Sequence, residues 1–588
     1  MAYTTPEDHL FQTKWGLHRN PFVFNSAESL DDASILQLFV ADPDSSLAAF
    51  SFNVNNIIRG AYGCGKTMCL RAVEAFAMSQ MLIDIVDTGR TGVLPVLVNL
   101  ADVGHLAESE HIYHAILHQV FLALGSLGRR VRQYVEVGGW FTPFRDWRKA
   151  LTESGIYAGD DRYDSYPALE IEDRVRKAFA PESKQPASSL LSALATAATR
   201  EKFLAITDLN RVHADLLAPY CDRLLLLVDE FGSLQPDFYV TKGAASSRYE
   251  TLMNQLRTSQ HVFYKICVYP GHYSDALQET RYGTRINLDY PIADLGALQR
   301  YEVISRNVLW KYIHATQNET DKRTLSDFIE LSPEPAAMSE VSYCARGPAS
   351  AFEQLCLGSL GVMRRLFTLS SKTMLMAASR NPVKVNRMVV QQRLETFGAE
   401  LIERHTPTER NQLKEISAVC KAAGTYKFSA EIDTRSLLKP FLSKTEQDSV
   451  LAVLESRSGR PVYQFDYAYC VANQLPTHAH PDSKEDCPAR TLTHGAWIDS
   501  VEDVTETVLN ISGLTRGVIV RYLPERQFGF IIFGSDEPEA FFHLNDIIEW
   551  DDATELDLDK RRVRFALGDS PRGKKARAVA IEPRFFER

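Results

Sequence analysis

A glycine-rich stretch near the N-terminus has the residue types and spacing of a phosphate-binding loop. Residues 57–70 read IIRGAYGCGKTMCL. They satisfy the pattern G-x-x-x-x-G-K-(S/T) through Gly60, Gly65, Lys66 and Thr67. Backbone N–H groups of such a loop wrap phosphates at the start of a helix, and Gly63 adds a flexible position. Lys66 would meet the β- and γ-phosphates of ATP, and the Thr67 hydroxyl would ligate Mg²⁺.

A second stretch supplies the acids that such a site needs. Residues 223–234, RLLLLVDEFGSL, end an apolar run in Asp229 and Glu230. Asp229 would hold Mg²⁺ through water, and Glu230 would act as the general base on the attacking water. The alternative is an ordinary buried strand that ends in acids. The independent phosphate loop favours a Walker B strand, so the sequence predicts ATP and Mg²⁺ as cofactors.

Cys64 lies inside the loop, beside Lys66 and at the expected start of a helix. These surroundings can lower the pKa of a thiol and make it reactive. The alternative is an inert residue at a permissive position, because the motif leaves that position free. In either case Cys64 belongs to the predicted nucleotide-binding loop.

The elements around these motifs fit a P-loop fold. The strand-like NVNNII (53–58) precedes the loop, the helix-like TMCLRAVEAFAMSQML (67–82) follows it, and VLPVLVNL (93–100) reads as the next strand. More than a hundred residues then separate this strand from Asp229, which predicts an insertion over about residues 105–220.

Basic and aromatic residues interleave within this insertion, over residues 128–151. Such a stretch could touch nucleic acid or a protein partner. The alternative is an amphipathic helix that places Trp140, Phe144 and Trp147 in the core.

Residues 11–400 resemble the AAA+ ATPases, especially the initiator-like branch that includes origin-recognition ATPases. The resemblance implies that WGLHRNPF (Trp15 to Phe22) lies near the adenine. It also implies that HVFYKICVYPGHYS (261–274) is a core strand ending in a polar sensor. Tyr269 and His272 stand there instead of the usual Asn or Thr.

The same resemblance suggests roles for three arginines. Arg281 and Arg285 lie where the family often places the arginine that reaches a neighbouring subunit's γ-phosphate; a solvated arginine is the alternative. Gly361 and Arg364 match the G-x-x-R of the second sensor, in a helical lid, where Arg364 would contact the nucleotide of its own subunit. The alternative is an ion pair of Arg364 or Arg365 with a nearby acid.

The region after the lid has the order of a winged helix. Residues 385–405, 406–423 and 441–457 read as helices, and PVYQFDYAYCVANQL (461–475) reads as a strand pair. Such a domain often follows the lid in the initiator-like branch. Its expected recognition helix is not strongly basic, so protein-partner binding rivals duplex DNA binding.

Residues of about 513–583 closely resemble a cold-shock domain, which implies a small five-stranded OB barrel. QFGFIIF and AFFHL take the place of its two nucleic-acid-binding strands. Its aromatic positions are occupied by Tyr522, Phe528, Phe530, Phe541 and His543. Arg521 replaces the usual Trp, and acids such as Glu539 dilute the basic edge. Exposed rings there would stack on unpaired bases; the alternative is a barrel used for protein contact.

Composition limits the classes of protein that fit. The 588 residues predict several domains, and the formal charge of −10 gives no general attraction to nucleic acid. No apolar run is long enough to span a membrane, and no secretory signal is visible, so we expect a cytoplasmic protein. The nine cysteines include no C-x-x-C pair. His478, His480, Cys487 and His494 could hold zinc, but their spacing is irregular.

The predicted fold class is multidomain α/β plus β. We expect a P-loop AAA+ core at 1–295, a helical lid at 296–400, a winged helix at 401–475, a linker at 476–510 and a cold-shock OB-fold domain at 511–588. The predicted function is an ATPase coupled to binding of single-stranded RNA or DNA, forming a homo-oligomer in its ATP state. The alternative is a nucleotide-gated sensor that recruits a separate effector protein, for example in bacterial antiviral defence.

Overall fold

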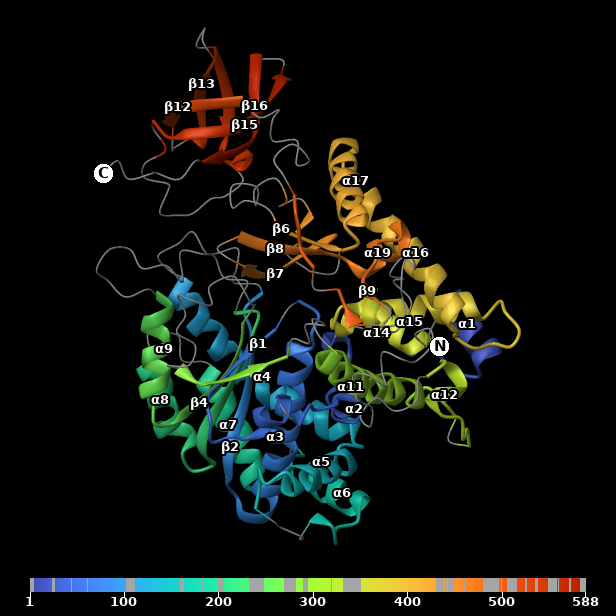
Figure 1. The fold of residues 1–588 in the computed structure, drawn as a ribbon. Helices are drawn as coiled ribbons and strands as arrows, with labels where there is room; N and C mark the ends of the chain where they lie inside the picture. Colours follow the sequence, from blue (N-terminus) through green and yellow to red (C-terminus); the bar gives the residue numbers. More distant parts are fainter. Residues whose placement is uncertain are drawn as a thin grey trace. The chain divides into compact units, whose positions relative to one another are not determined.

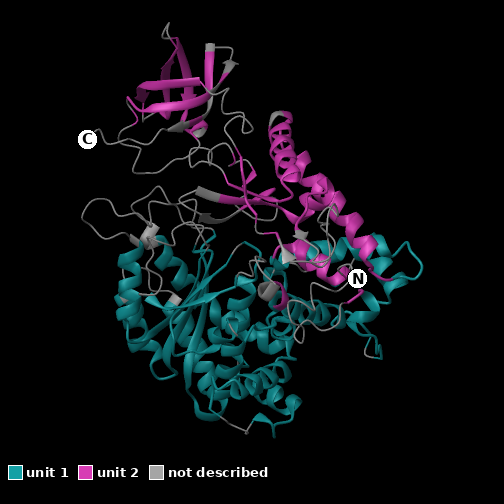
Figure 2. Cartoon of the chain, viewed as in Figure 1, with its two compact units in different colours: residues 1–291, 300–328, 361–383 teal, residues 292–299, 329–360, 384–588 magenta. Residues whose placement is uncertain are grey.

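The computed structural model describes most of the chain, with gaps. It describes residues 5–23, 27–43, 45–60, 62–101, 112–158, 163–180, 183, 185–198, 206–231, 248–268, 282–288, 295–318, 320–331, 350–429, 438, 441–442, 449–457, 460–479, 496–498, 500–504, 515–523, 526–534, 538–547, 558, 560–570 and 573–581. The chain forms two compact units (Figure 2). Unit 1 comprises residues 1–291, 300–328 and 361–383, and unit 2 comprises residues 292–299, 329–360 and 384–588.

A parallel five-stranded sheet forms the centre of unit 1, in the order β2-β3-β4-β1-β5. Figure 1 labels its strands β1, β2 and β4. Its strands are β1 (Asn56–Arg59), β2 (Thr91–Asn99), β3 (Cys221–Asp229), β4 (Val262–Val268) and β5 (Thr284–Asn287). The apolar run of β3 is buried because strands inside a parallel sheet are covered on both faces. The predicted α/β core of parallel strands and helices is therefore confirmed.

Helix α3 (Lys66–Thr88) starts directly after the glycine-rich loop. It packs against β2 and β3 and against helices α5, α6 and α7. Most of its residues are buried, which explains why its apolar residues are not confined to one stripe. The helix ends at Gly89, whose φ of 78° suits a residue without a Cβ.

The stretch between β2 and β3 is largely helical. It contains α4 (Ile112–Val137), α5 (Phe141–Glu153), α6 (Ala168–Ala178), α7 (Pro186–Ala198), α8 (Ile206–Val212) and the π-helix η6 (His213–Leu217). Trp140 and Phe144 are fully buried. The Trp147 ring stacks on Phe50, with centroids 4.9 Å apart, and its Nε1–H donates to the Leu36 carbonyl. These contacts confirm the alternative prediction for this stretch, in which its aromatic residues pack in the core.

Shorter elements complete unit 1. They are α1 (Pro6–Leu10), η1 (Phe11–Trp15), η2 (Ala27–Ser29), α2 (Asp32–Leu38), η3 (Ser46–Phe50), α9 (Arg248–Thr258), α12 (Leu325–Phe328), α15 (Met363–Ala377) and most of α11 (Leu295–His314). The N-terminal segment is attached to α15. Trp15 Nε1–H donates to the Met374 carbonyl at 3.2 Å, and Phe22 stacks on Phe367.

Unit 2 contains helices, a mixed sheet and a barrel. Its helices are α14 (Ala351–Ser359), α16 (Arg387–Glu403), α17 (Pro407–Ala422) and α19 (Tyr467–Asn473). The sheet has the order β11-β6-β8-β7 and consists of β6 (Lys427–Ser429), β7 (Leu451–Arg457), β8 (Arg460–Phe465) and β11 (Glu502–Asp503). A small pair joins β9 (His478–Ala479) to β10 (Ala496–Trp497).

Two predicted elements of this region are wrong. Residues 451–457 form strand β7 rather than the end of a helix, and 467–473 form helix α19 rather than a second strand. A short apolar run such as LAVL fits a strand as well as a helix, and pairing with β8 decides it. Asp466 caps the start of helix α19, because its Oδ1 accepts hydrogen bonds from the Ala468 and Tyr469 N–H groups.

The last five strands form a closed barrel in the order β12-β13-β14-β16-β15. They are β12 (Thr515–Leu523), β13 (Phe528–Phe533), β14 (Glu539–His543), β15 (Arg562–Ser570) and β16 (Gly573–Ile581), with the 3₁₀ turn η14 (Leu544–Asp546) after β14. The pair β14–β16 is parallel, and the other neighbours are antiparallel. The barrel core includes Ile519, Ile531, Phe542 and Phe565.

Within the described ranges, no helix is long and apolar enough to cross a membrane. The cysteines in those ranges are free thiols, most of them buried. Of the residues considered for zinc, His480, Cys487 and His494 lie outside the described residues, and the side chain of His478 is not described either.

Candidate nucleotide-binding site

The glycine-rich loop joins β1 to α3, as a phosphate-binding loop requires. The Gly60 N–H donates to the Val268 carbonyl of β4 and so fixes the start of the loop. Lys66 is 7% exposed, and its Nζ donates to the Gly60 carbonyl at 2.6 Å. Gly65 caps α3 with a φ of 105°, a conformation that L-residues avoid, although a Cβ there would meet nothing within 4 Å. Glycine is therefore required at this position because of its positive φ, and not because a side chain would clash with a neighbour.

The predicted acids lie next to this loop. Asp229 is 3% exposed, and burial raises the pKa of its carboxyl. A hydrogen bond with the Thr67 side chain, the Glu230 N–H and the charge of Lys66 oppose that rise. The influence of Thr67 on the pKa of Asp229 indicates that the two predicted magnesium ligands, which come from α3 and β3, lie close together.

Glu230 has a left-handed backbone, with a φ of 55°. This region is uncommon for residues other than glycine and costs about 1–3 kcal/mol, so such residues often serve a functional site. Its N–H donates to Asp229 Oδ1 at 2.9 Å, which directs the chain out of the sheet. No pattern in the sequence predicts this backbone conformation.

One cavity is lined both by residues of the glycine-rich loop and by Glu230. It encloses about 1080 Å³, part of it open to solvent. One part of its lining carries the polar side chains of Glu28, Tyr62, Lys66, Thr67, Glu230 and Arg364. The rest is mainly apolar and includes Leu38, Phe39, Val40, Leu288, Ile304, Val308, Tyr312 and Phe367. An apolar wall beside a basic loop suits a nucleoside triphosphate, whose base is flat and whose phosphates are charged.

Arg364, predicted to contact the nucleotide, is among the residues that line this cavity. Its backbone N–H donates to the Gly63 carbonyl at 3.1 Å, which attaches α15 to the loop. Its guanidinium lies 4.6 Å from the centre of the Tyr62 ring. Sequence reasoning missed Tyr62, because the motif leaves that position free. Cys64 also lines the cavity and is partly exposed.

Other predicted residues lie elsewhere. Arg285 is an exposed residue within β5, opposite Ile57 of β1, and is not among the residues that line the cavity. Trp15 to Phe22 do not line it either; Phe22 instead supports Phe367, which does. Arg281, Tyr269 and His272 lie outside the described residues.

The residues present fit Mg²⁺ together with ATP. Thr67 and Asp229 offer the hard oxygen ligands that Mg²⁺ prefers, and Thr67 lies near enough to Asp229 to lower the pKa of its carboxyl. Lys66 and the loop N–H groups would hold the phosphates. These are the residues that would hold the metal and the nucleotide in this chain.

The barrel carries a second group of predicted residues. Phe528, Phe530 and Phe541 are partly exposed, and their ring centroids lie 5.3–6.1 Å apart. Arg521 is exposed and pairs across the sheet with Phe530, while partly exposed His543 pairs with Phe528. Tyr522 is only 9% exposed and belongs to the barrel core beside Phe542, so its predicted role as a stacking platform is not supported.

Comparisons with known proteins give weak likenesses. No protein-family model matches the chain, and no curated protein sequence matches it. The Orc1 protein of Aeropyrum pernix in complex with DNA is 13% identical, with a TM-score of 0.30 over 75% of this chain and 95% of that chain. The Thermotoga maritima RuvB Holliday junction branch migration motor is 13% identical, with a TM-score of 0.27 and the same coverage. Drosophila ORC bound to DNA is 10% identical, with a TM-score of 0.28 over 80% of this chain and 99% of that chain. At these identities and TM-scores, the similarity to these structures carries no argument about this chain.

Proposed function

We propose that this chain is a Mg²⁺-dependent ATPase of the AAA+ type that works together with a single-stranded nucleic-acid-binding barrel. The observation that carries the ATPase proposal is the single cavity that Lys66, Thr67 and Glu230 all line, with Asp229 bonded to the Glu230 N–H directly beside it. This observation supports assigning the glycine-rich loop and the acidic end of β3 to one site, although they lie more than a hundred residues apart in the sequence.

The residues of the site have separate tasks in the proposed reaction. Lys66 and the loop N–H groups neutralise the β- and γ-phosphates, and Arg364 adds a second positive charge from α15. Glu230 holds the attacking water and accepts its proton, which is the general-base step. Mg²⁺, when bound to Thr67 and Asp229, supplies charge neutralisation on the phosphates.

An arginine from a second copy of the chain would complete this site. Arg285 is a candidate because it is exposed on β5 and does not line the cavity of its own chain. Arg281 remains a candidate from the sequence alone. We therefore propose a homo-oligomer in the ATP state.

For the barrel we propose a cold-shock type of OB fold. Its five-strand order and its three clustered, partly exposed phenylalanines support this assignment. Rings in such a cluster can stack on unpaired bases, whose faces are free in single-stranded RNA or DNA and covered in a duplex.

The ATPase proposal is tested by comparing two variants with the parent. Lys66→Ala should weaken ATP binding about tenfold or more, because the charge that meets the phosphates is lost. Glu230→Gln should still bind ATP but turn over at least about a hundredfold more slowly, since the base is lost. Nucleotide anisotropy measures binding, and phosphate release measures turnover.

Turnover of Glu230→Gln at the parental rate would contradict the assigned base. The parent should also be assayed alone, with single-stranded RNA, with single-stranded DNA and with duplex. Stimulation by one single strand supports the coupled ATPase. Slow turnover that no polymer changes, with tight nucleotide retention, would instead support a nucleotide-gated sensor.

A further inference from the structure

A second cavity lies in unit 1, at the opposite edge of the central sheet from the phosphate-binding loop. It encloses about 1260 Å³, part of it open to solvent. Its lining includes Thr91 and Asp222, at the starts of β2 and β3, whereas Asp229 stands at the end of β3. It also includes Gln80, which follows Lys66 on α3 by about 21 Å along the helix axis. No described residue lines both cavities, so the two are separate.

Two arginines line this second cavity, and each lies over an aromatic ring. Arg148 of α5 has its Cζ 4.3 Å from the centre of the Tyr157 ring, and Arg223 of β3 has its Cζ 4.5 Å from the centre of the Phe263 ring. Arg148 Nη1 donates to Gln80 Oε1 at 3.3 Å, while its buried Nε–H has no acceptor among the described residues. A ring under a guanidinium fixes its plane without using its in-plane donors, which suit an anion.

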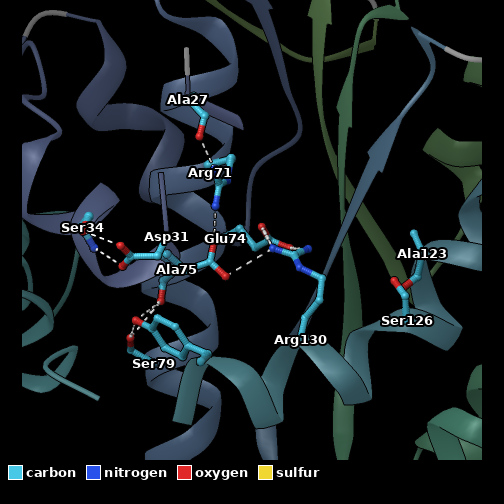
Figure 3. Close-up of polar contacts among 12 residues, drawn as sticks. Ala27, Asp31, Ser34, Arg71, Glu74, Ala75, Ser79, Ala123, Ser126 and Arg130 are labelled. Carbon is cyan, nitrogen blue, oxygen red and sulfur yellow. Dashed lines mark hydrogen bonds and ion pairs between the residues drawn. The ribbon is translucent and has the colours of Figure 1, made fainter. Parts of the chain in front are cut away.

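Other arginines beside α3 are paired with acids. Arg130 donates two hydrogen bonds to the fully buried Glu74 (Figure 3). Arg71 donates to Asp32 Oδ1 at 2.5 Å. In the part of the chain that the structure describes, the two arginines of the second cavity contact rings and an amide, and no carboxylate. They differ in this respect from the arginines that stabilise the fold through ion pairs.

The acids of the second cavity already have partners. Asp222 pairs with Arg90 at 2.8 Å. Asp84 accepts hydrogen bonds from Gln80 Nε2 at 2.8 Å and from the Thr91 hydroxyl at 3.3 Å. Neither acid therefore stands as a direct counter-charge to the two cavity arginines. Cations that are partly removed from water favour a counter-charge, and a bound anion supplies one.

The rest of the lining suits an organic anion better than a free ion. It combines polar side chains with apolar ones, among them Ser51, Asn53, Phe52 and Ile156. Hydroxyl and amide groups can bind the hydroxyls of a sugar, and apolar groups can cover its carbon skeleton or a base.

We propose that this cavity binds a small phosphate monoester, whose phosphate group is held by Arg148 and Arg223. A phosphate accepts charge-assisted hydrogen bonds from guanidinium groups, and its three terminal oxygens can serve two arginines at once. The shared chemistry is a phosphate on a hydroxylated compound, either a sugar phosphate or a nucleoside monophosphate. This inference is independent of the proposed ATPase activity, because the site lies at the other edge of the sheet.

Isothermal titration calorimetry of Lys66→Ala without Mg²⁺ tests the proposal, because this variant weakens phosphate binding at the glycine-rich loop. The probes are ribose 5-phosphate, AMP, adenosine and inorganic phosphate. Both esters should bind. Adenosine, which lacks the phosphate, and inorganic phosphate, which lacks the sugar, should bind at least about tenfold more weakly. Tighter binding of AMP than of ribose 5-phosphate would support a nucleotide as the source, and equal binding would support a sugar phosphate.

Two further substitutions in the same Lys66→Ala protein test the arginines. Arg148→Gln and Arg223→Gln should each lower the affinity for ribose 5-phosphate at least about tenfold, because a charge-assisted hydrogen bond is lost. Lys149→Gln is the matched control, since it removes the charge of the next, exposed residue of α5 and should leave the affinity unchanged. Thermal unfolding identifies a variant that does not fold. Arg223→Gln keeps the test valid if Arg148→Gln fails to fold, because Arg223 is partly exposed at the start of β3.

Unchanged affinity in the folded arginine variants would overturn the inference, and so would adenosine binding as tightly as AMP. Inorganic phosphate binding as tightly as the esters would overturn it too, because the cavity would then hold only a free ion. Esters that bind the parent but not Lys66→Ala would belong to the phosphate-binding loop instead. A failure of the proposed ATPase is a separate result, since it would appear as no phosphate release from ATP while ribose 5-phosphate still binds.

Discussion

Lys265 is a fully buried lysine in the middle of strand β4. Its Nζ donates to the Ser51 carbonyl at 3.0 Å, to the Val54 carbonyl at 3.1 Å and to Asn56 Oδ1. These acceptors lie in and before β1, so this side chain fixes the segment that leads into the phosphate-binding loop. Burial lowers the pKa of Lys265 from 10.5 to about 7.

This pKa predicts a pH dependence of stability. Between pH 7 and pH 10.5 the unfolded chain holds a proton on Lys265 that the folded chain partly lacks, so the free energy of unfolding should rise with pH. The rise from this one group is at most about 1.4 kcal/mol per pH unit. Lys265→Met should flatten it, as measured by urea unfolding at several values between pH 7 and pH 9.

The slopes are the quantity to compare, because Lys265→Met also leaves three oxygen acceptors without their donor. Lys149→Met, at an exposed lysine of α5, should keep the parental slope. Equal slopes for all three proteins would show that Lys265 stays charged in the folded chain.

At the scale of elements, α16 and α19 meet at a glycine. A Cβ on Gly398 would lie 2.2 Å from the Ala468 carbonyl oxygen and 2.8 Å from the Ala472 Cβ. The nearest obstacle is backbone, which cannot turn away as a flexible side chain would. The close approach of the two helices therefore depends on this missing Cβ.

Gly398→Ala should change the free energy of unfolding in two opposite ways, through helix propensity and through packing. Alanine inside a helix is favoured over glycine by about 1 kcal/mol. Overpacking against a fixed backbone costs about 1–3 kcal/mol, and the 2.2 Å approach places this site at the upper end. We expect a net loss of about 1–2 kcal/mol in thermal unfolding of unit 2.

Gly92→Ala is the matched control, because a Cβ at Gly92 would meet nothing within 4 Å. It should leave the unfolding temperature nearly unchanged. A Gly398→Ala protein more stable than the parent would mean that α16 and α19 separate easily.

The sequence predicted the elements whose signals are local. The glycine-rich loop, the strands around it and the acidic end of β3 have such local signals, because each is set by a few neighbouring residues. Strand β7 and helix α19 were missed, since pairing with β8 and the cap at Asp466 decide between strand and helix. Tyr522 was placed among the stacking residues because its inward orientation depends on barrel closure.

Contacts between distant residues could not be predicted in this way. Arg71 and Ala27 are 44 residues apart, and nothing in the spacing of either segment indicates their hydrogen bond. The same holds for the cation–π contact of Arg364 with Tyr62. Such contacts leave no pattern in the sequence, whereas the proposed role of Lys66 follows from its motif.

At the scale of the whole molecule, the proposal joins the ATPase to the barrel. Phe528→Ala combined with Phe530→Ala in the full chain should weaken single-strand binding by roughly 2 kcal/mol or more, because both rings offer stacking faces. Stimulation of ATP turnover by the single strand should fall with it, while turnover without nucleic acid stays parental. Fluorescence anisotropy and phosphate release measure the two effects.

Salt separates stacking from charge in this experiment. The loss caused by the phenylalanine variants should persist at high salt, whereas a loss caused by replacing the exposed Lys574 should shrink, because only the charge is screened. If the double variant binds and responds as the parent does, the barrel serves protein contact instead.

Unit 1 consists of three separate segments of the chain, and this has a consequence for its synthesis. The residues that line the cavity run from Ala27 to Phe367, and unit 1 includes residues 361–383, which follow residues 329–360 of unit 2. A ribosome working at about 5–20 residues per second needs roughly 20–70 s to reach this last segment. Until then the phosphate loop exists without Arg364 and without the wall that α15 provides. A nascent chain therefore cannot complete this cavity early, and the start of unit 2 is translated before unit 1 is complete.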